Sequence, residues 1–474
     1  MADKPTAKKP AKPTAPTSHT LEDVAALAKR RGFIFQGSEI YGGLAGTWDY
    51  GPYGVLLKNN LKQLWWKHFV TERDDVYGLD TAILMNARVW EASGHTGAGF
   101  ADPLVEDKKT HLRYRADHLL EDNGVDNADE LSVAEMDAKI KELKLESPEG
   151  NELTPVRVFN LMFQTQIGVV SDTANTVYLR PETAQGMFVN FKNVLDSLHP
   201  RLPFGLAQIG KNFRNEITPK DFIFRVRELE IMEFEYFIRE GEWQQRYAEL
   251  HKSMNEWFAR IGLAKADLKE IDVPAADRAH YSKKTTDFYF NFPHKFDEIA
   301  GLAYRTDFDL ANHTKHSGVD LSYLDPQTNE RFIPHAIEPT FGLDRHVLAV
   351  MSAAYTIEEV NGEQRTVLKL KPELAPVKVA VSPLLRNKPE LTKLAGEVYH
   401  TLKKAFGEVM YDDNGNIGKR YRRQDEIGTP LCVVVDFDSL TDKQVTIRHR
   451  DTLKQVRVPI AEITKQIADQ LAQF

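Results

Sequence analysis

The sequence predicts an α+β protein in which an antiparallel sheet forms the main body and a small α/β domain follows it. Three observations support this class. Strand-like runs between Asn160 and Tyr304 are mixed with helical stretches such as 243–261, without the regular strand–helix repeat of a parallel sheet. Two prolines within 370–376 mark a domain boundary. Beyond residue 377 the order becomes strand, helix, basic loop, two strands and a final helix.

Length and composition limit the possible classes of protein. The chain has 474 residues, 42% of them hydrophobic, which is enough for two or three domains. No apolar run approaches the roughly 18 residues that span a bilayer, so no membrane partner is expected. Because the formal net charge is −8, a nucleic-acid partner would have to bind local basic patches. The single cysteine, Cys432, excludes an intrachain disulfide and is expected to be buried in an apolar strand.

The first elements are predicted in chain order. Residues 1–20, rich in Lys, Ala, Pro and Thr, are expected to form a disordered tail. A helix at 21–31 leads into a stretch rich in glycine and aromatic residues at 41–54, and an amphipathic helix follows at 55–70. The broad aromatic face of this second helix indicates that it is buried or faces another subunit.

The middle of the chain contains an acidic segment. Residues 121–150 hold ten acidic residues against three lysines, with few aromatic residues. This composition predicts an inserted surface module within a domain that spans 21–370. The final domain is expected to span 377–474, and the apolar stripe of its helix at 391–406 is typical of a helix packed on a sheet.

The most informative feature is a predicted hairpin made of residues 210–216 and 222–237. Burying arginines and carboxylates on a sheet face costs free energy unless something pairs with them. We therefore expect an anion at the arginine end and a cation at the glutamate end. Strict alternation places the following side chains on one face of the second strand: Arg225, Arg227, Leu229, Ile231, Glu233 and Glu235. The opposite face receives Phe224, Val226, Met232, Phe234 and Tyr236, with Glu228 and Glu230.

Arg214 precedes the turn of this hairpin, within 213–216. An arginine fork suits a phosphate, which it can bind through two parallel hydrogen bonds. Taken alone, so short a motif favours a surface ion pair. The arginines and the glutamate that follow it on one face favour instead a substrate that carries both signs of charge.

Two further clusters contain charged residues near predicted helix starts. Glu182 follows Pro181 in the first turn of a helix, where a carboxylate also stabilises the helix N-terminus. Arg345 lies in the first turn of a helix that begins near Leu343. A cation is unfavourable there, and an anion bound at that end would account for it.

Together these clusters resemble the glycyl-tRNA synthetases of the single-chain, homodimeric type. Residues 180–186 (RPETAQG) resemble the family signature, residues 213–216 (FRNE) with the following strand resemble class II motif 2, and residues 342–345 (GLDR) resemble motif 3. Segments 39–54, 90–95 and 305–310 are also similar to the family. The resemblance runs from about Phe33 through the last domain, and excludes the tail and the acidic insert.

The resemblance implies a fold, a reaction and an ATP site. The fold would be a class II antiparallel-sheet catalytic domain with a C-terminal α/β anticodon-binding domain. Glycine would attack the α-phosphate of ATP, and the terminal ribose of tRNA(Gly) would then take the glycyl group. Arg214, Glu216 and Arg345 would be catalytic, and Glu298 would help to hold Mg²⁺. The implied ATP-binding residues are Arg214, Asn215, Glu216, Phe224, Arg225, Val226, Arg227, Glu228, Leu229, Glu298, Ile299, Gly342, Leu343, Asp344 and Arg345.

The resemblance also implies a glycine site built on three carboxylates. Because glycine has no side chain, the site must bind its ammonium group and leave no room at its α-carbon. Thr340 stands where the family has serine, and its extra methyl group would tighten that exclusion. The implied glycine-binding residues are Arg115, Glu182, Leu229, Glu230, Ile231, Met232, Glu233, Glu338, Pro339, Thr340, Phe341 and Gly342.

Two departures from the family pattern matter. Leu229 stands where the family has a phenylalanine that stacks on adenine, and leucine lacks the ring quadrupole. Either the affinity for ATP is lower or a nearby aromatic ring substitutes. Some bacterial relatives carry cysteine pairs in the insert; this chain has none there, so zinc is not predicted.

The last domain resembles an anticodon-binding module. Its basic loop would contact phosphates and stack on bases through Lys419, Arg420, Tyr421, Arg422 and Arg423, although a solvated basic loop is the alternative. The family further implies a cytoplasmic homodimer formed through residues 47–76. Two other functions remain open: a class II synthetase for histidine, proline or threonine, and a synthetase-like nucleic-acid-binding subunit without catalysis.

Overall fold

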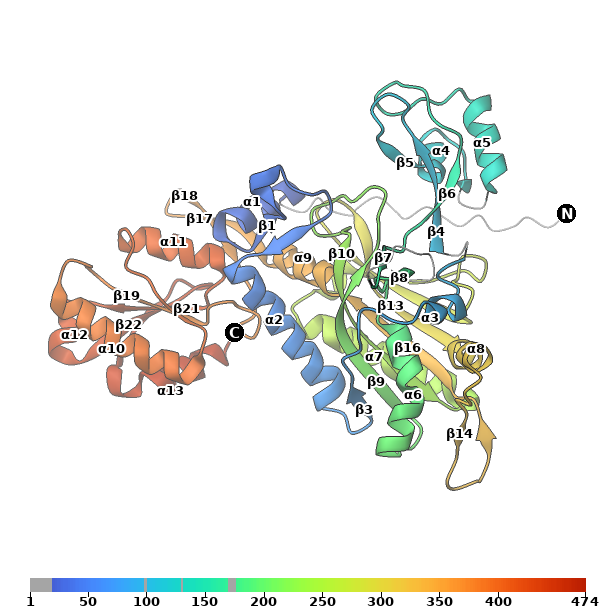
Figure 1. The fold of residues 1–474 in the computed structure, drawn as a ribbon. Helices are drawn as coiled ribbons and strands as arrows, with labels where there is room; N and C mark the ends of the chain where they lie inside the picture. The colour runs from blue at the N-terminus through green and yellow to red at the C-terminus, as the bar shows by residue number, and fades with distance from the viewer. Residues whose placement is uncertain (1–18, 98–99, 129–130, 169–175) are drawn as a thin grey trace.

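The computed structural model describes residues 19–97, 100–128, 131–168 and 176–474. The expected tail at 1–20 therefore lies outside the described residues except for its last two. Figure 1 shows a central body, a small module that projects from it and a C-terminal domain on the opposite side. Within the described part of the chain, no helix is both long and apolar enough to cross a membrane.

The main body is built on a seven-stranded sheet with the order β11-β12-β13-β16-β10-β9-β3. The pairs are antiparallel except at the edge, where β3 runs parallel to β9. The predicted antiparallel sheet is thus confirmed. The strands are β3 (Val76–Gly78), β9 (Phe204–Phe213), β10 (Glu228–Ile238), β11 (Leu268–Asp272), β12 (Lys284–Asn291), β13 (Phe296–Thr306) and β16 (His335–Gly342).

Helices cover the two faces of this sheet unequally. On one face α2 (Pro52–Trp66), α7 (Trp243–Arg260) and α9 (Leu343–Ala354) share a core with Met232 and Phe234 of β10. On the other face α6 (Ala184–Leu198) and α8 (Phe308–Ser317) pack only over the end of β10 that carries Phe237. The charged residues Glu233 and Glu235 follow the same alternation as Phe237, so the predicted charged face of this strand is confirmed.

The start of the second hairpin strand was predicted wrongly. The strand begins at Glu228, and residues 222–227 form a turn with a single bridge between Lys220 and Arg225. Asp221 and Phe222 have φ angles of 59° and 58°, which extended backbone does not allow. Arg225 and Arg227 are therefore presented by a loop beyond the end of the sheet.

Smaller elements connect and flank the body. Helix α1 (Leu21–Arg31) is followed by the hairpin β1 (Ile34–Gln36) and β2 (Trp48–Tyr50). Helix α2 continues as a short π-helical turn at Lys67–Thr71, which completes the helix expected at 55–70. The remaining elements of the body are α3 (Ala87–Ala92), β7 (Gln164–Gln166), β8 (Thr176–Tyr178), β14 (Tyr323–Leu324), β15 (Arg331–Phe332), β17 (Tyr355–Val360) and β18 (Glu363–Leu368).

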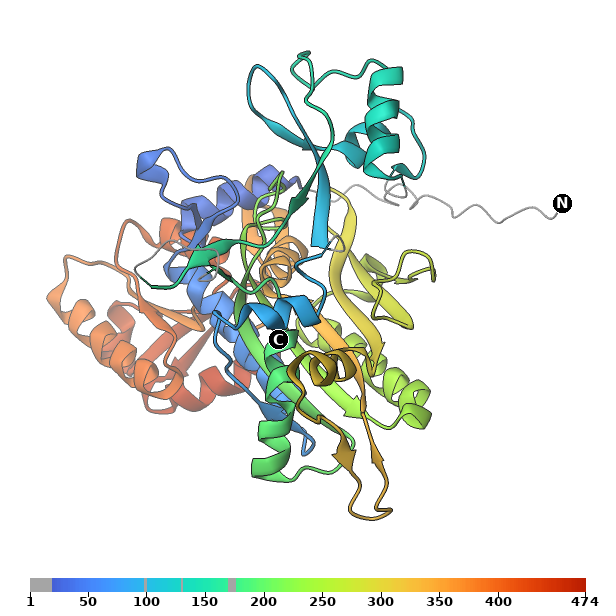
Figure 2. The ribbon, with the colours of Figure 1, turned by 45° about the vertical axis from the view of Figure 1, so that its right-hand side comes forward.

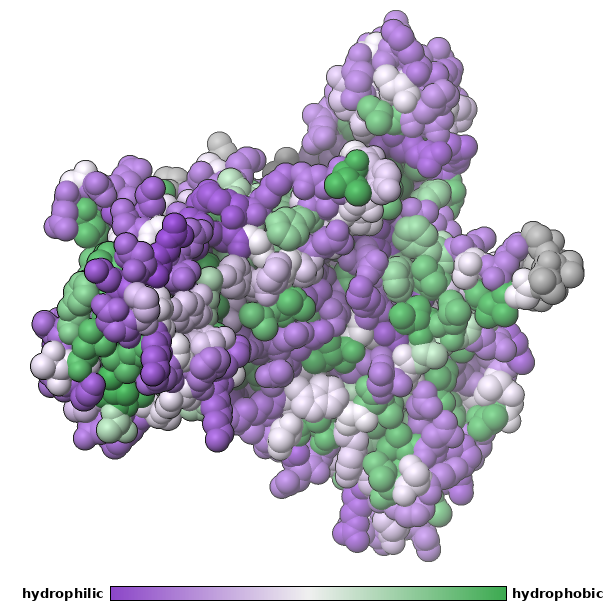
Figure 3. Space-filling view, turned by 60° about the vertical axis from the view of Figure 1, so that its left-hand side comes forward, coloured by the Kyte–Doolittle hydropathy of each residue, from purple (hydrophilic) through white to green (hydrophobic). Residues whose placement is uncertain are grey.

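The inserted module is wider than the acidic segment that predicted it. It consists of the three-stranded sheet β5-β4-β6 and two helices, with a core of its own that includes Val105, Leu120 and Ile140. Figures 1 and 2 show it set apart from the body, and in Figure 3 it forms a separate, mostly hydrophilic lobe. Its elements are β4 (Ala101–Glu106), β5 (Arg113–Arg115), α4 (Ala116–Asp122), α5 (Val133–Glu142) and β6 (Arg157–Asn160).

The C-terminal domain has a five-stranded sheet with the order β20-β19-β21-β22-β23. Cys432 is buried in β21, as predicted, and burial raises the pKa of its thiol to about 12. The predicted basic loop is instead helix α11, which Asn416 caps at its start and Gly428 ends. The elements are β19 (Val379–Pro383), α10 (Pro389–Phe406), β20 (Val409–Tyr411), α11 (Ile417–Ile427), β21 (Leu431–Val435), α12 (Phe437–Asp442), β22 (Gln444–His449), β23 (Gln455–Pro459) and α13 (Ile463–Leu471).

Candidate active site

A cleft of about 700 Å³ lies on the charged face of the main sheet. This volume includes the open space at the mouth of the cleft. Strands β10, β13 and β16 form its floor, and the turn that precedes β10 forms one wall. The predicted residues that line it are Arg214, Glu216, Phe224, Arg225, Val226, Leu229, Glu230, Ile231, Glu298, Ile299, Thr340, Gly342, Asp344 and Arg345.

One end of the cleft is cationic. Arg214 donates from Nε to the carbonyl oxygen of Pro181 at 3.2 Å, which fixes its direction. Among the described residues, no carboxylate forms an ion pair with Arg214 or Arg225, although both line the cleft. Two half-buried guanidinium groups without a carboxylate partner form a ready site for an anion.

Arg345 lies at the start of α9 and faces the same space. Its Nη1 donates to the carbonyl oxygen of Glu298 at 2.9 Å and pairs with the carboxylate of that residue at 3.1 Å. The guanidinium lies over the ring of Phe224, 4.4 Å from its centroid. An aromatic ring therefore does line the cleft, on the Arg345 side and not at Leu229.

The signature segment 180–186 connects this end of the cleft to the other. Arg180 is buried and donates to the carbonyl oxygens of Lys211 and Thr81, both at 2.8 Å, so it holds the segment against β9. Thr183 donates from its backbone N–H to Glu233 at 2.9 Å, and its hydroxyl donates to the same oxygen. A Cβ at Gly186 would lie 2.1 Å from Oγ1 of Thr81, so only glycine fits there.

A buried cluster of acidic side chains, called here the acidic pocket, lies next to the other end of the cleft, where Thr340 of the lining donates to Glu233 at 3.2 Å. Glu182, Glu233 and Glu338 meet there, and Arg305 donates to Glu338 at 3.1 Å and pairs twice with Asp309. Burial, followed by the charges of Glu338 and Glu182, raises the pKa of Glu233 to about 7. The pKa of Glu338 is also raised, mainly by burial. Arg305 thus offsets only part of the acidic charge, and the pocket favours a positively charged guest.

Glu182 differs from its two neighbours. Burial raises its pKa, but the interactions with His95, Arg305 and Gln185 together outweigh burial and hold the pKa well below its usual range. His95 lies 3.3 Å from one carboxylate oxygen, and Gln185 donates to the other at 3.0 Å. Glu182 is thus the carboxylate that stays charged while Glu233 can hold a proton.

Several residues of this pocket were not among the predicted site residues. Asp309 and His95 lie in segments that resemble the family, and that resemblance was their only signal in the sequence. Glu235 was assigned to the correct face but to no role. Its two carboxyl oxygens are buried without a hydrogen-bond partner among the described residues, and burial together with Glu338 raises its pKa well above the usual value. Asp287, whose pKa burial and Glu298 raise to about 7, had no signal in the sequence.

Several predicted residues, some of them in the lining of the cleft, have side chains that are engaged elsewhere. The side chains of Glu230 and Asp344 pair with Lys58 of α2, at 3.0 and 3.1 Å. Arg227 donates to the carbonyl oxygens of Ala45 and Glu216 and so braces the turn. The side chains of Val226, Met232, Phe341, Leu343 and Ile299 belong to the hydrophobic core. Glu228 is exposed and pairs with Lys211.

Three predicted residues lie at the edges of the site. Arg115 belongs to the insert and pairs with Asp102 at 2.9 Å and with Asp117. It lines a second, smaller hollow that it shares with Glu216 and Arg225 of the turn. Asn215 is half-buried beside Arg214, and Pro339 lies within β16 between Glu338 and Thr340.

Most residues predicted to bind tRNA are engaged within the protein. Arg420 is buried and donates to the carbonyl oxygens of Pro383, Asp413 and Gly415. Arg423 pairs with Asp412 at 2.6 Å. Tyr421 is covered by Arg448, and Arg422 pairs with Glu363 at 3.1 Å. Lys419 alone of the five is exposed without such a contact in the described structure.

Two family models match the chain, one in each domain. The model described as "tRNA synthetase class II core domain (G, H, P, S and T)" matches residues 163–354, which include the cleft. The model described as "Anticodon binding domain" matches residues 378–470.

Several proteins that are similar to this chain carry one name. Proteins named glycine–tRNA ligase from Caldanaerobacter subterraneus subsp. tengcongensis and Geobacillus kaustophilus are 49% and 51% identical to this chain. Each alignment covers 96% of this chain and 99% of the relative. The solved structure of prolyl-tRNA synthetase from Cryptosporidium parvum, complexed with L-proline and AMP, matches with a TM-score of 0.63. It covers 98% of this chain and 78% of its own at 15% identity, so it shares the fold.

Proposed function

This chain belongs to the glycine–tRNA ligases, the class II synthetases that attach glycine to tRNA(Gly) through a glycyl-adenylate, and we propose which of its residues carry out the reaction. The observation that carries the proposal is the pairing of two opposite sites in one cleft. Unpaired arginines at one end suit ATP, and an acidic pocket at the other suits the glycine ammonium group.

The ATP phosphates bind at the cationic end. Arg214 contacts the α-phosphate, and Arg225 and Arg345 contact the outer phosphates. The adenine packs between Leu229 and the guanidinium of Arg345. The other face of this guanidinium contacts the ring of Phe224, whose centroid lies 4.4 Å away. Asn215 and Glu216 lie on the nucleotide side of the turn. The absence of a competing carboxylate beside Arg214 and Arg225, within the described chain, supports these roles.

Mg²⁺ would be held by Glu298, assisted by Asp287. The two carboxylates lie on neighbouring strands, Glu298 lines the cleft, and its charge contributes to the raised pKa of Asp287. Oxygen donors that repel one another fit a hard divalent cation. Bound there, the ion would offset the negative charge of the phosphates.

Glycine binds with its ammonium group toward Glu182, Glu233 and Glu338. Its carboxylate oxygen attacks the α-phosphorus, and the bond from that phosphorus to the bridging oxygen breaks, so that pyrophosphate leaves. Arg214 stabilises the negative charge of the transition state. Thr340, whose hydroxyl donates to Glu233 at 3.2 Å, presents its methyl group where a larger amino acid would need room. The terminal ribose hydroxyl of tRNA then takes the glycyl group, and AMP leaves.

The glycine KM should depend on pH through Glu233. Below about pH 7 this carboxyl group holds a proton that the ammonium group of glycine must displace. As the pH falls below that value, the glycine KM should therefore rise by up to about tenfold per pH unit. Above that value the KM should be constant. The charged groups that face Glu233 are Glu182, Glu338, Glu235, Arg305 and Arg180. The KM is measured by ATP–pyrophosphate exchange at saturating ATP.

Two variants test this assignment. Glu233→Gln should raise the glycine KM and remove its dependence on pH around neutrality. Glu330→Gln, at an exposed carboxylate paired with Arg239, should keep the wild-type profile. A wild-type KM that stays constant from about pH 6 to about pH 8 would show that Glu233 is not the group displaced.

The enzyme works as a cytoplasmic homodimer formed through residues 47–76. Exposed apolar side chains next to this segment support an interface: Ile40 and Tyr41 are 88% and 86% exposed. Patches of this kind mark association surfaces. The C-terminal domain binds the anticodon region of tRNA(Gly), as the matching domain model supports.

Amino-acid-dependent exchange tests the specificity of the cleft. Glycine should support ATP–pyrophosphate exchange, and alanine or serine should support less than about one hundredth of it, because their β-carbons meet Thr340 and the pocket floor. The assay is run with each of the common amino acids. Exchange with no amino acid would contradict catalysis in this cleft, and comparable exchange with alanine would contradict the role of Thr340.

A further inference from the structure

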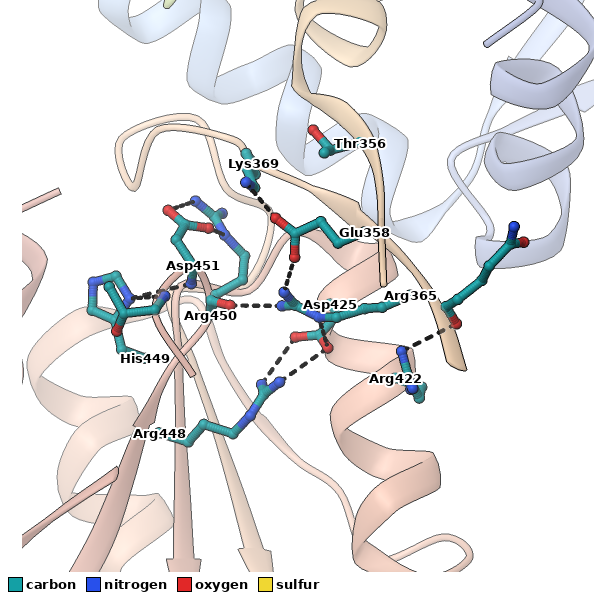
Figure 4. A network of polar contacts seen from close by, with 12 residues as sticks. Thr356, Glu358, Arg365, Lys369, Arg422, Asp425, Arg448, His449, Arg450 and Asp451 are labelled. Carbon is teal, nitrogen blue, oxygen red and sulfur yellow. Dashed lines mark hydrogen bonds and ion pairs between the residues drawn. The ribbon is translucent and has the colours of Figure 1, made fainter. Parts of the chain in front are cut away.

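A buried ion pair joins the main body to the C-terminal domain. Arg365 lies on β18, in a hairpin whose ends pack into the core of the body through Tyr355 and Leu368. Asp425 lies on α11, in the C-terminal domain. Nε of Arg365 donates to Asp425 at 2.7 Å, and the two side chains are 2% and 1% exposed. Figure 4 shows the pair at the centre of a polar network.

All three guanidinium nitrogens of Arg365 are engaged, and in different parts of the molecule. Nη1 donates to Glu358 on the neighbouring strand at 2.6 Å. Nη2 donates to the carbonyl oxygen of Arg450 in the C-terminal domain, also at 2.6 Å. The planar fork thus binds three acceptors at fixed angles, which a flexible ammonium group could not do.

Asp425, the other member of the pair, is also fixed by hydrogen bonds within the C-terminal domain. Arg448 donates to both oxygens of Asp425, at 2.9 and 3.2 Å. Arg450 donates to the carbonyl oxygens of Gly428 and of Leu370, the latter in the segment between the domains, both at 2.8 Å. We call these five residues the joint: Glu358, Arg365, Asp425, Arg448 and Arg450.

The joint connects two functional regions. Helix α9, which carries Arg345 at its start, ends at Ala354, and β17 begins at the next residue. The hairpin is therefore a direct extension of a helix of the cleft. On the other side, α11 also receives Arg30 and Arg31 of α1, which pair with Glu426 at 3.1 and 2.6 Å. Arg422 of α11 pairs with Glu363 of the hairpin, so this helix contacts the main body at several points.

A buried ion pair between two domains favours one relative orientation of those domains over nearby orientations. Taking Arg365 and Asp425 out of water is costly, and only the observed geometry returns the lost hydrogen bonds. Rotation of the C-terminal domain would separate Arg365 from Asp425 and from the carbonyl oxygen of Arg450, and would leave each buried charge with fewer partners than it needs. The network consequently holds the domain in one orientation relative to the cleft.

We propose that the Arg365–Asp425 pair fixes the C-terminal domain in the orientation that charging of full-length tRNA requires. The two residues are positioning residues for the transfer step, and they are not needed to form the adenylate. This rests on the cleft being the site of adenylate formation. Because tRNA contacts both domains, a fixed orientation raises the effective concentration of the acceptor end at the cleft once the other end has bound.

The variants Arg365→Met and Asp425→Asn test the proposal in the full-length enzyme. Glycine-dependent exchange should stay within about twofold of the wild type, and the KM for full-length tRNA(Gly) should rise at least about tenfold with a smaller change in kcat. An RNA hairpin that contains only the acceptor stem should be charged as by the wild type. Arg365→Lys, which keeps the charge but not the fork, should lie between. The double variant should be no worse than the poorer single one, because the two changes remove one interaction.

The matched control is Glu363→Gln. This residue lies on the same hairpin and pairs with Arg422 of the same helix, but its side chain is 80% exposed. An exposed pair contributes little, so charging should be unchanged. Charging of full-length tRNA within about twofold of the wild type in both joint variants would overturn the proposal, and so would loss of exchange together with charging. Absence of exchange in the wild type would instead contradict the proposed function.

Discussion

Replacing Arg214 with alanine is expected to lower glycine-dependent ATP–pyrophosphate exchange by about 10³-fold. The guanidinium is held toward the cleft by the carbonyl oxygen of Pro181, and no carboxylate of the described chain neutralises it. In the role proposed for it, Arg214 would be placed in advance to meet the charge that develops on the α-phosphate. Loss of such a group raises the barrier to the chemical step and leaves glycine binding largely intact.

Two further measurements separate an effect of the Arg214 substitution on the chemical step from effects on folding and on tRNA binding. Arg214→Lys should recover part of the exchange activity, since it restores a positive charge without the two-pronged geometry. Binding of tRNA(Gly) to Arg214→Ala should match the wild type in a filter-binding assay. If the alanine variant keeps more than about a tenth of the exchange rate, Arg214 does not stabilise the transition state.

The sequence pattern predicts the centre of the sheet well, and it fails where another interaction overrides alternation. On β10 the pattern holds because β9 and β16 pair on both sides of it and α7 and α9 bury every second residue. Residues 222–227 alternate in the same way, but the left-handed backbone at Asp221 and Phe222 turns them out of the sheet. No composition signal marks these two positions.

The sequence motifs identify the segments that form the site, but they do not show which side chains of a segment enter the site and which enter the core. Glu233 and Met232 are neighbours in sequence, yet one enters the acidic pocket and the other the core. Glu182 and Glu338 were correctly expected near Glu233, because the resemblance to the family implies that the three carboxylates share one site. Asp287 could not be found, because only the pairing of β12 with β13 brings it close enough to Glu298 for that charge to raise its pKa.

The basic segment of the C-terminal domain shows a second limit. Arginines at 420, 422 and 423 have the spacing of a helix as well as the composition of a nucleic-acid-binding loop. Sequence composition reports the charge of a side chain but not its partner. Arg420 and Arg423 find theirs in the carbonyl oxygens and Asp412 of their own domain.

Replacing Arg305 with methionine is expected to destabilise the main body by about 3–5 kcal/mol. Arg305 is 1% exposed and pairs with Asp309 at 2.8 Å and with Glu338 at 3.1 Å. Its guanidinium also lies 3.8 Å from the ring centroid of Tyr281. Without it, the buried carboxyl groups of Asp309 and Glu338 would lose their guanidinium partner. The loss is measured as the change in the free energy of unfolding in urea, followed by tryptophan fluorescence.

The dependence on pH distinguishes loss of the charge from loss of packing. Burial already raises the pKa values of Glu233 and Glu338, and loss of Arg305, whose charge lowers both, raises them further above their values in the unfolded chain. A carboxyl group with a raised pKa binds its proton more tightly in the folded state, so stability is lost as the pH rises through that value. The deficit of Arg305→Met should therefore be largest near pH 8 and shrink toward about pH 6. Arg331→Met, at an exposed pair with Asp320, should cost less than about 1 kcal/mol at either pH. A deficit for Arg305→Met that does not change with pH would assign the effect to the lost contacts with Tyr281 and Phe188 and not to charge.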